Sequence, residues 1–354
     1  MSIQATEAGT VHSAPASAVA IEAADLVKTY PKGVRALNQL SFAVPAGTIF
    51  GLLGPNGAGK STTVKILTTL AQADSGAASV AGLDVRAQPA RVRRVIGVVA
   101  QHSGADPTAT GRENLLLSGR IQGLRGRDLS RRADELLSRF SLTGAAGRMV
   151  RTYSGGMQRR LDVAMGLINR PQVLFLDEPT AGLDPESRSA MWDEIARLSR
   201  GEGLTILLTT HYLEEADRLA SRLAIVDRGR VVTEGTPDEL KAQLRGDTVL
   251  VELAAPGDPG RLDAILGQVH GVREVGITGT RVSARADDGA TAVPALLATL
   301  DRAGIAVHGV TAARPSLDDV YLRYAGRRFA EAEEPATASQ PAGQPGPNPS
   351  GGSR

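Results

Sequence analysis

The sequence contains 354 residues, 42% of them hydrophobic, so it is long enough to form two or three globular domains with ordinary cores. Its 40 lysine and arginine residues nearly balance its 38 aspartate and glutamate residues, and a formal charge of +2 gives no electrostatic reason to expect a nucleic-acid partner. The chain has no cysteine, which excludes disulfides, thiol catalysis and cysteine-bound metals.

The two ends of the chain lack the patterns of ordered or membrane-inserted segments. Residues 1–20 are rich in Ala, Ser, Thr and Gly, carry no signal-peptide pattern and are predicted to be a disordered lead. Residues 331–354 are rich in Pro, Gly and Ser and are predicted to be a disordered tail. Apolar runs elsewhere are shorter than the roughly 20 residues that cross a bilayer. We therefore expect a soluble, cytoplasmic chain that relies on another polypeptide to cross any membrane.

The first ordered stretch, residues 21–45, mixes apolar residues with turn formers and predicts short antiparallel strands. Tyr30 lies within it, just upstream of the glycine-rich motif described next. Spacing alone leaves two roles open for this side chain: it stacks on an adenine ring, or it is an ordinary half-buried strand aromatic.

A glycine-rich motif follows the apolar run at residues 48–53 and precedes a helical pattern. Its residues are Gly54, Pro55, Asn56, Gly57, Ala58, Gly59, Lys60 and Ser61, with Thr62 next in the helix. A strand, a glycine loop and a helix in this order are typical of a P-loop, in which backbone N–H groups and the helix N-terminus bind phosphates. We expect Lys60 to reach the β- and γ-phosphates of a nucleoside triphosphate and Ser61 to bind Mg²⁺.

The middle of the chain combines strands with a helical region. Residues 77–85 and 95–100 are predicted to be strands, and Gln101 follows the second of them. The pattern then becomes helical, which predicts a helical subdomain at about residues 102–168. Residues 153–157 form a second Ser/Gly-rich turn at the start of a helix, which in isolation would only cap that helix.

Two buried strands then end in polar residues that are suited to catalysis. Residues 172–176 form a continuous apolar run followed by Asp177 and Glu178, and residues 205–210 are predicted to form another buried strand, which is followed by His211. Open α/β sheets bind ligands at the carboxyl ends of their strands. We therefore expect Asp177 to organise Mg²⁺, Glu178 to polarise the attacking water and His211 to contact the γ-phosphate.

A predicted hairpin at residues 223–234 closes a nucleotide-binding domain that spans residues 21–245. A new pattern of strands and helices in the order βαββαβ follows and predicts a small, ferredoxin-like α+β domain over residues 248–327. Within it, we expect one helix to open at Pro294 and a last helix at residues 316–324. Because no His, Asp or Glu residues cluster there, regulation, dimer contact and partner binding all stay open.

Two groups of arginines stand out from the balanced charge. They are Arg91, Arg93 and Arg94, and Arg125, Arg127, Arg131 and Arg132. The simplest interpretation is that they form solvated faces, and contact with anionic headgroups or with a partner is the alternative.

Taken together, these motifs make residues 21–245 resemble the ATP-binding subunit of ABC transporters, an α/β P-loop NTPase fold with a helical subdomain. By this resemblance, residues 54–61 correspond to the Walker A loop, and Asp177 and Glu178 to the Walker B pair. The resemblance further assigns Gln101 as the Q-loop glutamine, Ser154, Gly155 and Gly156 as the signature loop, Asp184 as the D-loop aspartate, His211 as the switch histidine and Tyr30 as the adenine-stacking aromatic. Tyr153 and Met157 stand where the commonest signature has Leu and Gln.

The resemblance implies an ATPase that uses Mg²⁺, bound by Ser61, Gln101 and Asp177. Lys60, Gln101, Glu178 and His211 would carry the catalytic roles. Two nucleotide domains would meet head to tail, so that the signature loop of one copy contacts the ATP held by the P-loop of the other.

A finer resemblance is to the daunorubicin-resistance-type branch of the family. It rests on residues 110–115, on the Tyr153 form of the signature and on residues 316–321. That branch exports drugs or antibiotics, which implies a separate integral membrane permease and a peripheral location on the cytoplasmic face of the membrane.

Two other classes of protein compete with this interpretation. A soluble ABC-type ATPase acting on DNA would carry long heptad insertions, and none separates Lys60 from Ser154; the kind that acts in translation usually carries two such domains. A non-catalytic, regulatory ATP-binding protein would not need the catalytic side chains that are intact here.

Overall fold

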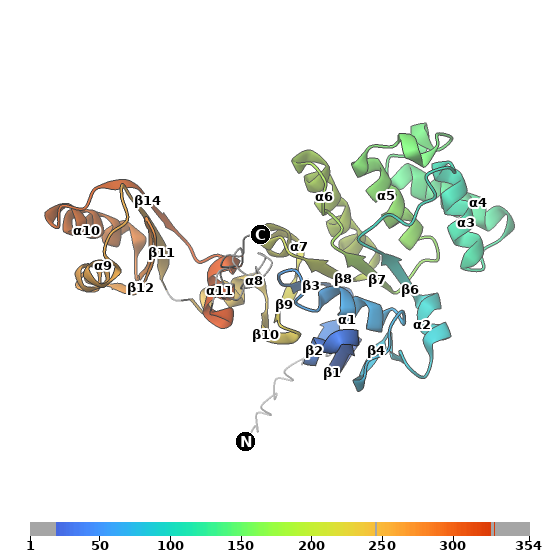
Figure 1. Ribbon diagram of the computed structural model, residues 1–354. Helices are drawn as coiled ribbons and strands as arrows, with labels where there is room; N and C mark the ends of the chain where they lie inside the picture. Colours follow the sequence, from blue (N-terminus) through green and yellow to red (C-terminus); the bar gives the residue numbers. More distant parts are fainter. Residues whose placement is uncertain (1–18, 245, 327–328, 330–354) are drawn as a thin grey trace, which may run out of the picture.

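The computed structural model describes residues 19–244, 246–326 and 329, which form a larger α/β unit and a smaller α+β unit (Figure 1). Most of the predicted lead and the whole predicted tail at residues 331–354 lie outside these described residues. The first strand begins at Val19, so the predicted lead at residues 1–20 is two residues too long. The reason is that the backbone of Val19 already pairs with Pro45 and the side chain of Ala20 is nearly buried.

The larger unit is built on a six-stranded sheet in the order β10-β9-β3-β8-β7-β6. Its strands are β3 (Ile49–Leu53), β6 (Ile96–Val99), β7 (Val173–Asp177), β8 (Thr205–Thr210), β9 (Arg222–Asp227) and β10 (Arg230–Gly235). All neighbours pair in parallel except β10, which returns antiparallel to β9. The turn between them is Arg228-Gly229, with φ of 48° and 75°, the left-handed pair that two-residue hairpins favour. The predicted hairpin is confirmed.

An antiparallel sheet lies against one face of this central sheet (Figure 1). It contains the antiparallel pairing predicted for residues 21–45, although the two strands are longer than the short ones expected. Its order is β2-β1-β4-β5, and the elements on this side are β1 (Val19–Tyr30), β2 (Val34–Pro45), β4 (Ser75–Val80), β5 (Leu83–Asp84), α1 (Lys60–Leu67) and α2 (Pro89–Val95). Apolar side chains of the two sheets and of α1 form one core. The rings of Phe42 and Phe50 stack in it with their centroids 5.5 Å apart.

Helices cover the other face of the central sheet. They are α3 (Gly111–Ile121), α4 (Gly126–Arg139), α5 (Gly155–Gly166) and α6 (Pro185–Glu202), and the first three form the predicted helical subdomain. Helix α4 shows why it packs there, since Leu129, Ala133 and Leu136 repeat at helical spacing and are all buried. Successive side chains of a central strand point to opposite faces of the sheet. Leu174 therefore packs in the core under these helices, and Phe175 packs in the core on the other face.

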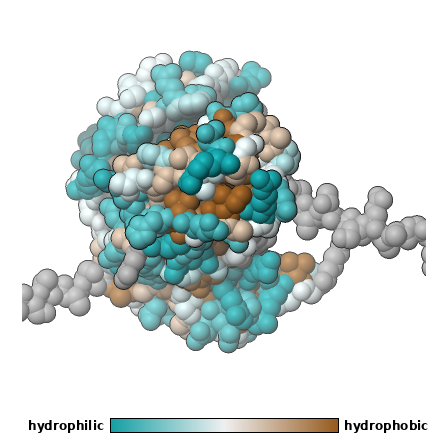
Figure 2. All heavy atoms as spheres, turned by 90° about the vertical axis from the view of Figure 1, so that its left-hand side faces the viewer, coloured by the Kyte–Doolittle hydropathy of each residue, from teal (hydrophilic) through white to brown (hydrophobic). Residues whose placement is uncertain are grey.

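The smaller unit, called the accessory domain here, has the ferredoxin-like order βαββαβ that the sequence predicts. It comprises β11 (Asp247–Leu253), α9 (Pro259–Leu266), β12 (Val272–Thr278), β13 (Arg281–Ala286), α10 (Gly289–Arg302) and β14 (Val307–Ala313). The sheet order is β12-β13-β11-β14 with all pairs antiparallel. Figure 2 views the molecule from the end at which this domain lies and shows hydrophilic side chains around a smaller hydrophobic region.

The prediction that a helix opens at Pro294 is wrong. Helix α10 begins at Gly289, because the side chain of Asp288 accepts a hydrogen bond from the backbone N–H of Ala290 and caps the helix there. Pro294 therefore lies inside the helix, where it lacks the N–H that would bond to the preceding turn.

The last helix, α11 (Leu317–Ala325), returns from the accessory domain to the larger unit, where α7 (Leu213–Leu219) and α8 (Pro237–Ala242) lie (Figure 1). Its apolar residues Leu317, Val320 and Tyr321 pack on side chains of α7, α8, β3 and β9. The predicted accessory boundary of 248–327 includes this helix, whereas its buried face belongs to the core of the larger unit. The apolar stripe correctly indicated a buried helix but carried no information about which unit buries it.

Within the described ranges, no helix combines the length and the apolar character needed to cross a bilayer.

Candidate functional site

The glycine-rich loop joins β3 to α1 at the carboxyl edge of the central sheet. Gly59 has a φ of 112°, a conformation that side-chain-bearing residues rarely adopt. A Cβ atom on Gly54 would lie 2.3 Å from the carbonyl oxygen of Val226, so this position also requires glycine. The hairpin turn supports the loop from outside, because the N–H of Gly229 donates to the carbonyl of Ala58 over 2.9 Å. The loop is thereby held in a fixed, open shape beside the helix N-terminus.

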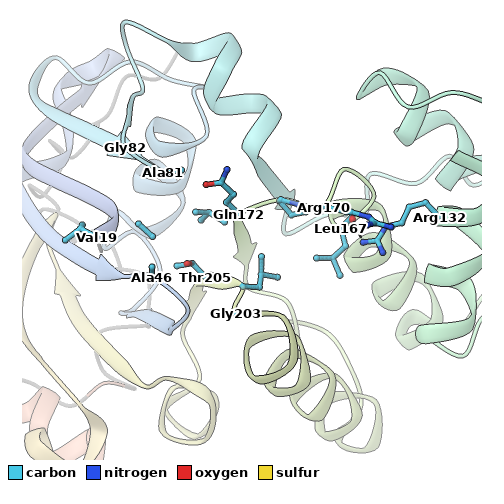
Figure 3. Close-up of a pocket in the computed structure, with 14 residues that line it drawn as sticks. Val19, Ala46, Ala81, Gly82, Arg132, Leu167, Arg170, Gln172, Gly203 and Thr205 are labelled. Atoms are coloured by element: carbon cyan, nitrogen blue, oxygen red, sulfur yellow. Dashed lines mark hydrogen bonds between the residues drawn. The ribbon is translucent and has the colours of Figure 1, made fainter. Parts of the chain in front are cut away.

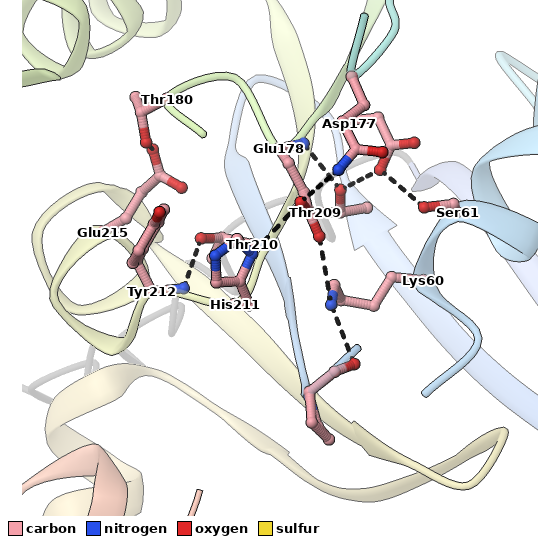
Figure 4. A network of polar contacts seen from close by, with 12 residues as sticks. Lys60, Ser61, Asp177, Glu178, Thr180, Thr209, Thr210, His211, Tyr212 and Glu215 are labelled. Carbon is pink, nitrogen blue, oxygen red and sulfur yellow. Dashed lines mark hydrogen bonds and ion pairs between the residues drawn. The ribbon is translucent and has the colours of Figure 1, made fainter. Parts of the chain in front are cut away.

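Lys60 is the first residue of α1 and is 4% exposed. Its ammonium donates hydrogen bonds to the carbonyl oxygens of Gly54, at 2.6 Å, and Pro55, at 3.1 Å. Nζ also lies 3.5 Å from Oε1 of Glu178 (Figure 4). The cation is therefore positioned inside the curve of the loop, at its junction with the acidic end of β7.

Ser61 faces the end of β7. Its hydroxyl donates to Oδ1 of Asp177 over 3.3 Å, and the hydroxyl of Thr209 on β8 donates to the same carboxylate oxygen (Figure 4). Hydroxyl and carboxylate oxygens are the ligands that Mg²⁺ prefers, and this ion usually takes one or two of them and completes its shell with water and phosphate. The pair fits such an ion. Among the described residues no group of three or more His, Cys, Asp or Glu side chains could hold a metal by itself.

Glu178 lies at the centre of the site and has a left-handed backbone, with φ of 48°. Such strain is uncommon outside glycine and concentrates at functional positions. Its Oε2 accepts a hydrogen bond from Nε2 of Gln101 at 3.0 Å and lies 3.3 Å from Nδ1 of His211, which is ion-pair distance without the alignment of a hydrogen bond. The neighbouring His211, and after it Lys60, hold the pKa of Glu178 below its ordinary value although burial acts in the opposite direction. The carboxylate is therefore ionised at neutral pH.

Arg159, on α5, is a site residue that the sequence prediction missed. Its guanidinium is 7% exposed and donates to the carbonyl of Ala100, just before Gln101, over 2.6 Å. It also donates to the carbonyls of Pro179, Asp177 and Glu178, at 2.6, 3.1 and 3.1 Å. The helix that follows the Ser/Gly-rich turn is thus tied to both catalytic segments.

Glu215 is a second buried residue that the sequence prediction missed. It is 0% exposed, and its Oε1 accepts a hydrogen bond from Thr180 at 2.8 Å (Figure 4). The same oxygen accepts a second hydrogen bond from the indole of Trp192 at 2.9 Å. This carboxylate connects the helix after His211 to the chain that follows the acidic pair. No sequence motif marked it.

The Ser/Gly-rich turn lies outside this cluster. Ser154 and Gly155 are exposed, and the Ser154 hydroxyl accepts a hydrogen bond from the N–H of Met157 at the start of α5. Tyr153, which stands where the commonest signature has Leu, is buried in the helical subdomain. Its hydroxyl donates a hydrogen bond to the carbonyl of Ala145 over 2.8 Å. The turn therefore exposes Ser154 and Gly155, whereas Gly156 is buried.

Three further predicted residues also lie apart from the carboxylate cluster. Asp184 is exposed and caps α6 by accepting a hydrogen bond from the N–H of Ser187 over 2.9 Å. Tyr30 is half-buried at the end of β1, with the ammonium of Lys28 5.8 Å from its ring centroid. Thr62 is half-buried in α1 behind Ser61.

A cavity of about 890 Å³ is not part of this site (Figure 3). It lies at the amino ends of β7 and β8, where Gln172 and Thr205 line it together with Arg132 of α4 and with Arg170, which lies between α5 and β7. The glycine-rich loop and the carboxylates lie at the carboxyl edge of the sheet, which is the opposite end of the same strands. The candidate catalytic residues are therefore separate from this cavity.

Two protein families match the sequence. The family described as ABC transporter matches residues 37–181, and the family described as ATP-binding protein DrrA1-3-like, C-terminal domain, matches residues 235–325. The daunorubicin resistance ATP-binding protein DrrA2 of Streptomyces coeruleorubidus is 47% identical, over 89% of this chain and 97% of that protein. The doxorubicin resistance ATP-binding protein DrrA of Mycobacterium tuberculosis is 46% identical over 83% and 90% of the two chains. The Nod factor export ATP-binding protein I of Sinorhizobium fredii is 40% identical over 88% of each.

Solved structures agree with the fold. A dimeric post-hydrolysis state of the ATP-binding cassette MJ0796, bound to ADP and Pi, matches with a TM-score of 0.56 and 26% identity, over 61% of this chain and 98% of that one. An ATP-binding subunit of an ABC transporter matches with a TM-score of 0.57 and 30% identity, over 63% and 92%. The expected P-loop fold, ATP hydrolysis and dependence on a separate permease are confirmed at the level of the family. The chain belongs to the ABC transporter family, as an ATP-binding and ATP-hydrolysing subunit of its daunorubicin-resistance-type branch.

Proposed function

We propose that this chain powers the export of a drug, antibiotic or other hydrophobic compound through a separate permease. The observation that carries the proposal is the convergence of the phosphate loop with Lys60, Asp177, Glu178 and His211 at one sheet edge, in a chain whose relatives are named for drug resistance. ATP binding and closure of the subunit would drive the permease in one direction, and hydrolysis would reset it.

Each residue of the site has a proposed role that follows from its position. The N–H groups of residues 56–60 bind the phosphates, and Lys60 exchanges its present partners for the β- and γ-phosphate oxygens. Ser61, Asp177 and Gln101 would hold Mg²⁺, and the ion would supply positive charge to offset that of the phosphates.

The attacking water is proposed to lie beside Glu178. This ionised carboxylate accepts the proton, and His211 and Gln101, which both contact its Oε2, orient it toward the γ-phosphate. Tyr30 stacks on the adenine from the end of β1. Arg159 acts as a positioning residue, because it holds the backbone of the catalytic segments without reaching the reacting atoms.

A second copy of the chain completes the site in this proposal. Ser154 caps α5, and Gly155 and Gly156 begin it. Their N–H groups and the helix N-terminus form an anion-binding surface that the chain's own P-loop does not use. Asp184 is likewise exposed at the start of α6. A head-to-tail pair would place these groups on the ATP held by the partner, forming two composite sites.

The permease is proposed to dock in a groove next to the Q-loop. This groove has a volume of about 320 Å³ and lies between β6 and helices α3 and α5, with Leu70, Val98, Ser118 and Met165 in its lining. Leu70 is 72% exposed and gives the groove an accessible apolar side chain. Docking there would hold the chain at the cytoplasmic face of the membrane and connect the permease to Gln101.

The first test compares the wild-type chain with Glu178→Gln in ATPase assays and in sedimentation with Mg·ATP. The variant should bind ATP and sediment as a dimer but lose roughly 10²- to 10⁴-fold in turnover, the range for removing general-base help. Glu252→Gln, which neutralises an exposed acid in the accessory domain, is the matched control and should behave as wild type. Unchanged turnover in Glu178→Gln would remove Glu178 from this role.

A mixing experiment tests the proposed pairing. Lys60→Met and Gly155→Asp should each be inactive alone, because one lacks the phosphate lysine and the other a usable signature loop. A mixture should recover ATPase activity. In a mixed dimer, the intact P-loop of the Gly155→Asp copy faces the intact signature loop of the Lys60→Met copy, so one of the two composite sites is complete. Absence of recovery, with both variants folded, would argue against sites shared between copies.

A further inference from the structure

The outer end of helix α3 exposes apolar side chains beside the proposed docking groove. Leu117 is 50% exposed and Ile121 is 75% exposed, and their spacing of four residues places them on one face of the helix. On one side of this face, Ser118 and Gln122 line the groove. The apolar face therefore continues the groove outward across the helical subdomain.

Unpaired arginines lie on the other side of the same face. Arg120 at the end of α3, and Arg125 and Arg127 at the start of α4, are exposed and line a hollow that they share with Leu116. None of the three makes an ion pair or a side-chain hydrogen bond with another described residue. Arg131, one turn further along α4, shows the contrast, because it pairs with Asp128 at 3.0 Å and with Glu135 at 3.7 Å.

We infer that this surface, formed by Leu117, Arg120, Ile121, Arg125 and Arg127, rests on the anionic headgroups of the lipid bilayer. Exposed aliphatic side chains next to cations are the composition of surfaces that lie in the membrane interface. The arginines remain exposed around an open hollow, which suits a diffuse layer of phosphates better than a fixed acidic segment of a protein. The inference rests on the proposed docking at the neighbouring groove, which would turn this side of the chain toward the membrane.

The expected strength follows from charge. Each arginine close to an anionic membrane surface contributes about 1 kcal/mol of binding, so three together contribute about 100-fold in the partition coefficient. Because these charges are exposed, the attraction should fall steeply when salt shortens the Debye length from about 10 Å to about 3 Å. Vesicles without anionic lipid should bind the chain only weakly.

The test is cosedimentation of the purified full chain with vesicles of phosphatidylcholine alone, and of phosphatidylcholine mixed with phosphatidylglycerol. The test variant is Arg120→Gln/Arg125→Gln/Arg127→Gln. The control is Arg86→Gln/Arg281→Gln/Arg314→Gln, which removes three exposed arginines elsewhere and changes the formal charge equally, from +2 to −1. The test variant should lose about 100-fold in partition to anionic vesicles, while the control should stay close to wild type.

Two results would overturn the inference. One is equal partition of the wild-type chain to neutral and anionic vesicles, and the other is an equal loss in the test and control variants. In the first case, a permease segment with acidic side chains becomes the better occupant of this surface. ATPase activity of the same variants without vesicles separates this inference from the proposed function, because the arginines lie outside the catalytic site. Intact ATPase with no vesicle binding removes only the membrane contact, whereas an inactive wild-type chain removes the proposed function.

Discussion

The ammonium of Lys60 and the carboxylate of Glu178 lie 3.5 Å apart, with 4% and 7% of their side chains exposed. A γ-phosphate bound in the loop would bring its charge to the same ammonium. The contact therefore stabilises the cation in the nucleotide-free chain, and ATP must compete with Glu178 for it. This relationship makes Lys60 important to stability as well as to binding.

Lys60→Met should abolish ATP binding and lower the free energy of unfolding by about 2–4 kcal/mol, because a buried carboxylate and two carbonyls lose a partner. Urea unfolding followed by Trp192, the only tryptophan and a buried residue of the larger unit, measures this loss. Lys60→Met/Glu178→Gln should regain part of the stability without regaining ATP binding. Strictly additive losses would show that the two residues do not interact.

The pH dependence of stability should change when Glu178 is replaced by Gln. His211 and Lys60 hold the pKa of Glu178 below its ordinary 4.5 in the folded chain, so the unfolded chain binds this proton more readily. The resulting stabilisation is complete above the unfolded pKa and is lost as the pH falls through the lower folded pKa. The difference in unfolding free energy between wild type and Glu178→Gln should therefore be constant from neutral pH to about pH 5 and then shift against the wild type. A difference that stays flat into more acidic solution would contradict the lowered pKa.

Arg159→Met should destabilise the chain by about 3 kcal/mol or more and should also slow ATP hydrolysis. The substitution leaves the carbonyls of Ala100, Asp177, Glu178 and Pro179 without this donor in a buried site. The matched control is Arg160→Met, whose guanidinium makes only longer contacts of 3.3 and 3.5 Å to backbone carbonyls and should cost about 1 kcal/mol or less. Unfolding curves measure the loss of stability, and single-turnover hydrolysis measures the loss of rate. Equal losses in both variants would contradict a specific role of Arg159 in holding the catalytic segments.

Features with a characteristic pattern of residue types could be predicted from the sequence. Hydrogen bonds from a side chain to backbone carbonyls could not. The P-loop carries its own glycine spacing. The strands β7 and β8 are predicted to be buried and are followed by Glu178 and His211, so the meeting of these two side chains at one sheet edge follows from the rule for parallel sheets. Arg159 has no such mark. Its partners are carbonyl oxygens, which every residue type supplies, and an arginine in a helix is ordinarily assigned to solvent.

The same limit explains the last helix. The stripe of Leu317, Val320 and Tyr321 predicts a buried face from periodicity, but periodicity contains no information on the partner. The chain leaves the accessory sheet after β14 and covers β9 and α8 instead. Only the folded arrangement shows that the accessory domain is inserted before a helix that belongs to the core of the larger unit.

Tyr321→Ala should therefore destabilise the larger unit although residue 321 lies after the accessory domain in sequence. Tyr321 is 0% exposed, packs edge-on against Phe329 and donates its hydroxyl to Asp227 over 3.0 Å. Removing a buried aromatic side chain of this kind costs about 3–5 kcal/mol. Trp192 lies in α6 of the larger unit, so its fluorescence reports the stability of that unit during urea unfolding.

Tyr324→Ala is the matched control on the same helix. Tyr324 is 40% exposed and bonds through its hydroxyl to Gln243, so its removal should cost about 1 kcal/mol or less. If α11 were only a part of the accessory domain, neither substitution would move the unfolding transition seen by Trp192. A loss confined to Tyr321→Ala would instead show that the last helix is part of the core of the larger unit. A variant that ends before Leu317 should then be destabilised as well, because Leu223 and Leu240 would lose the side chains that cover them.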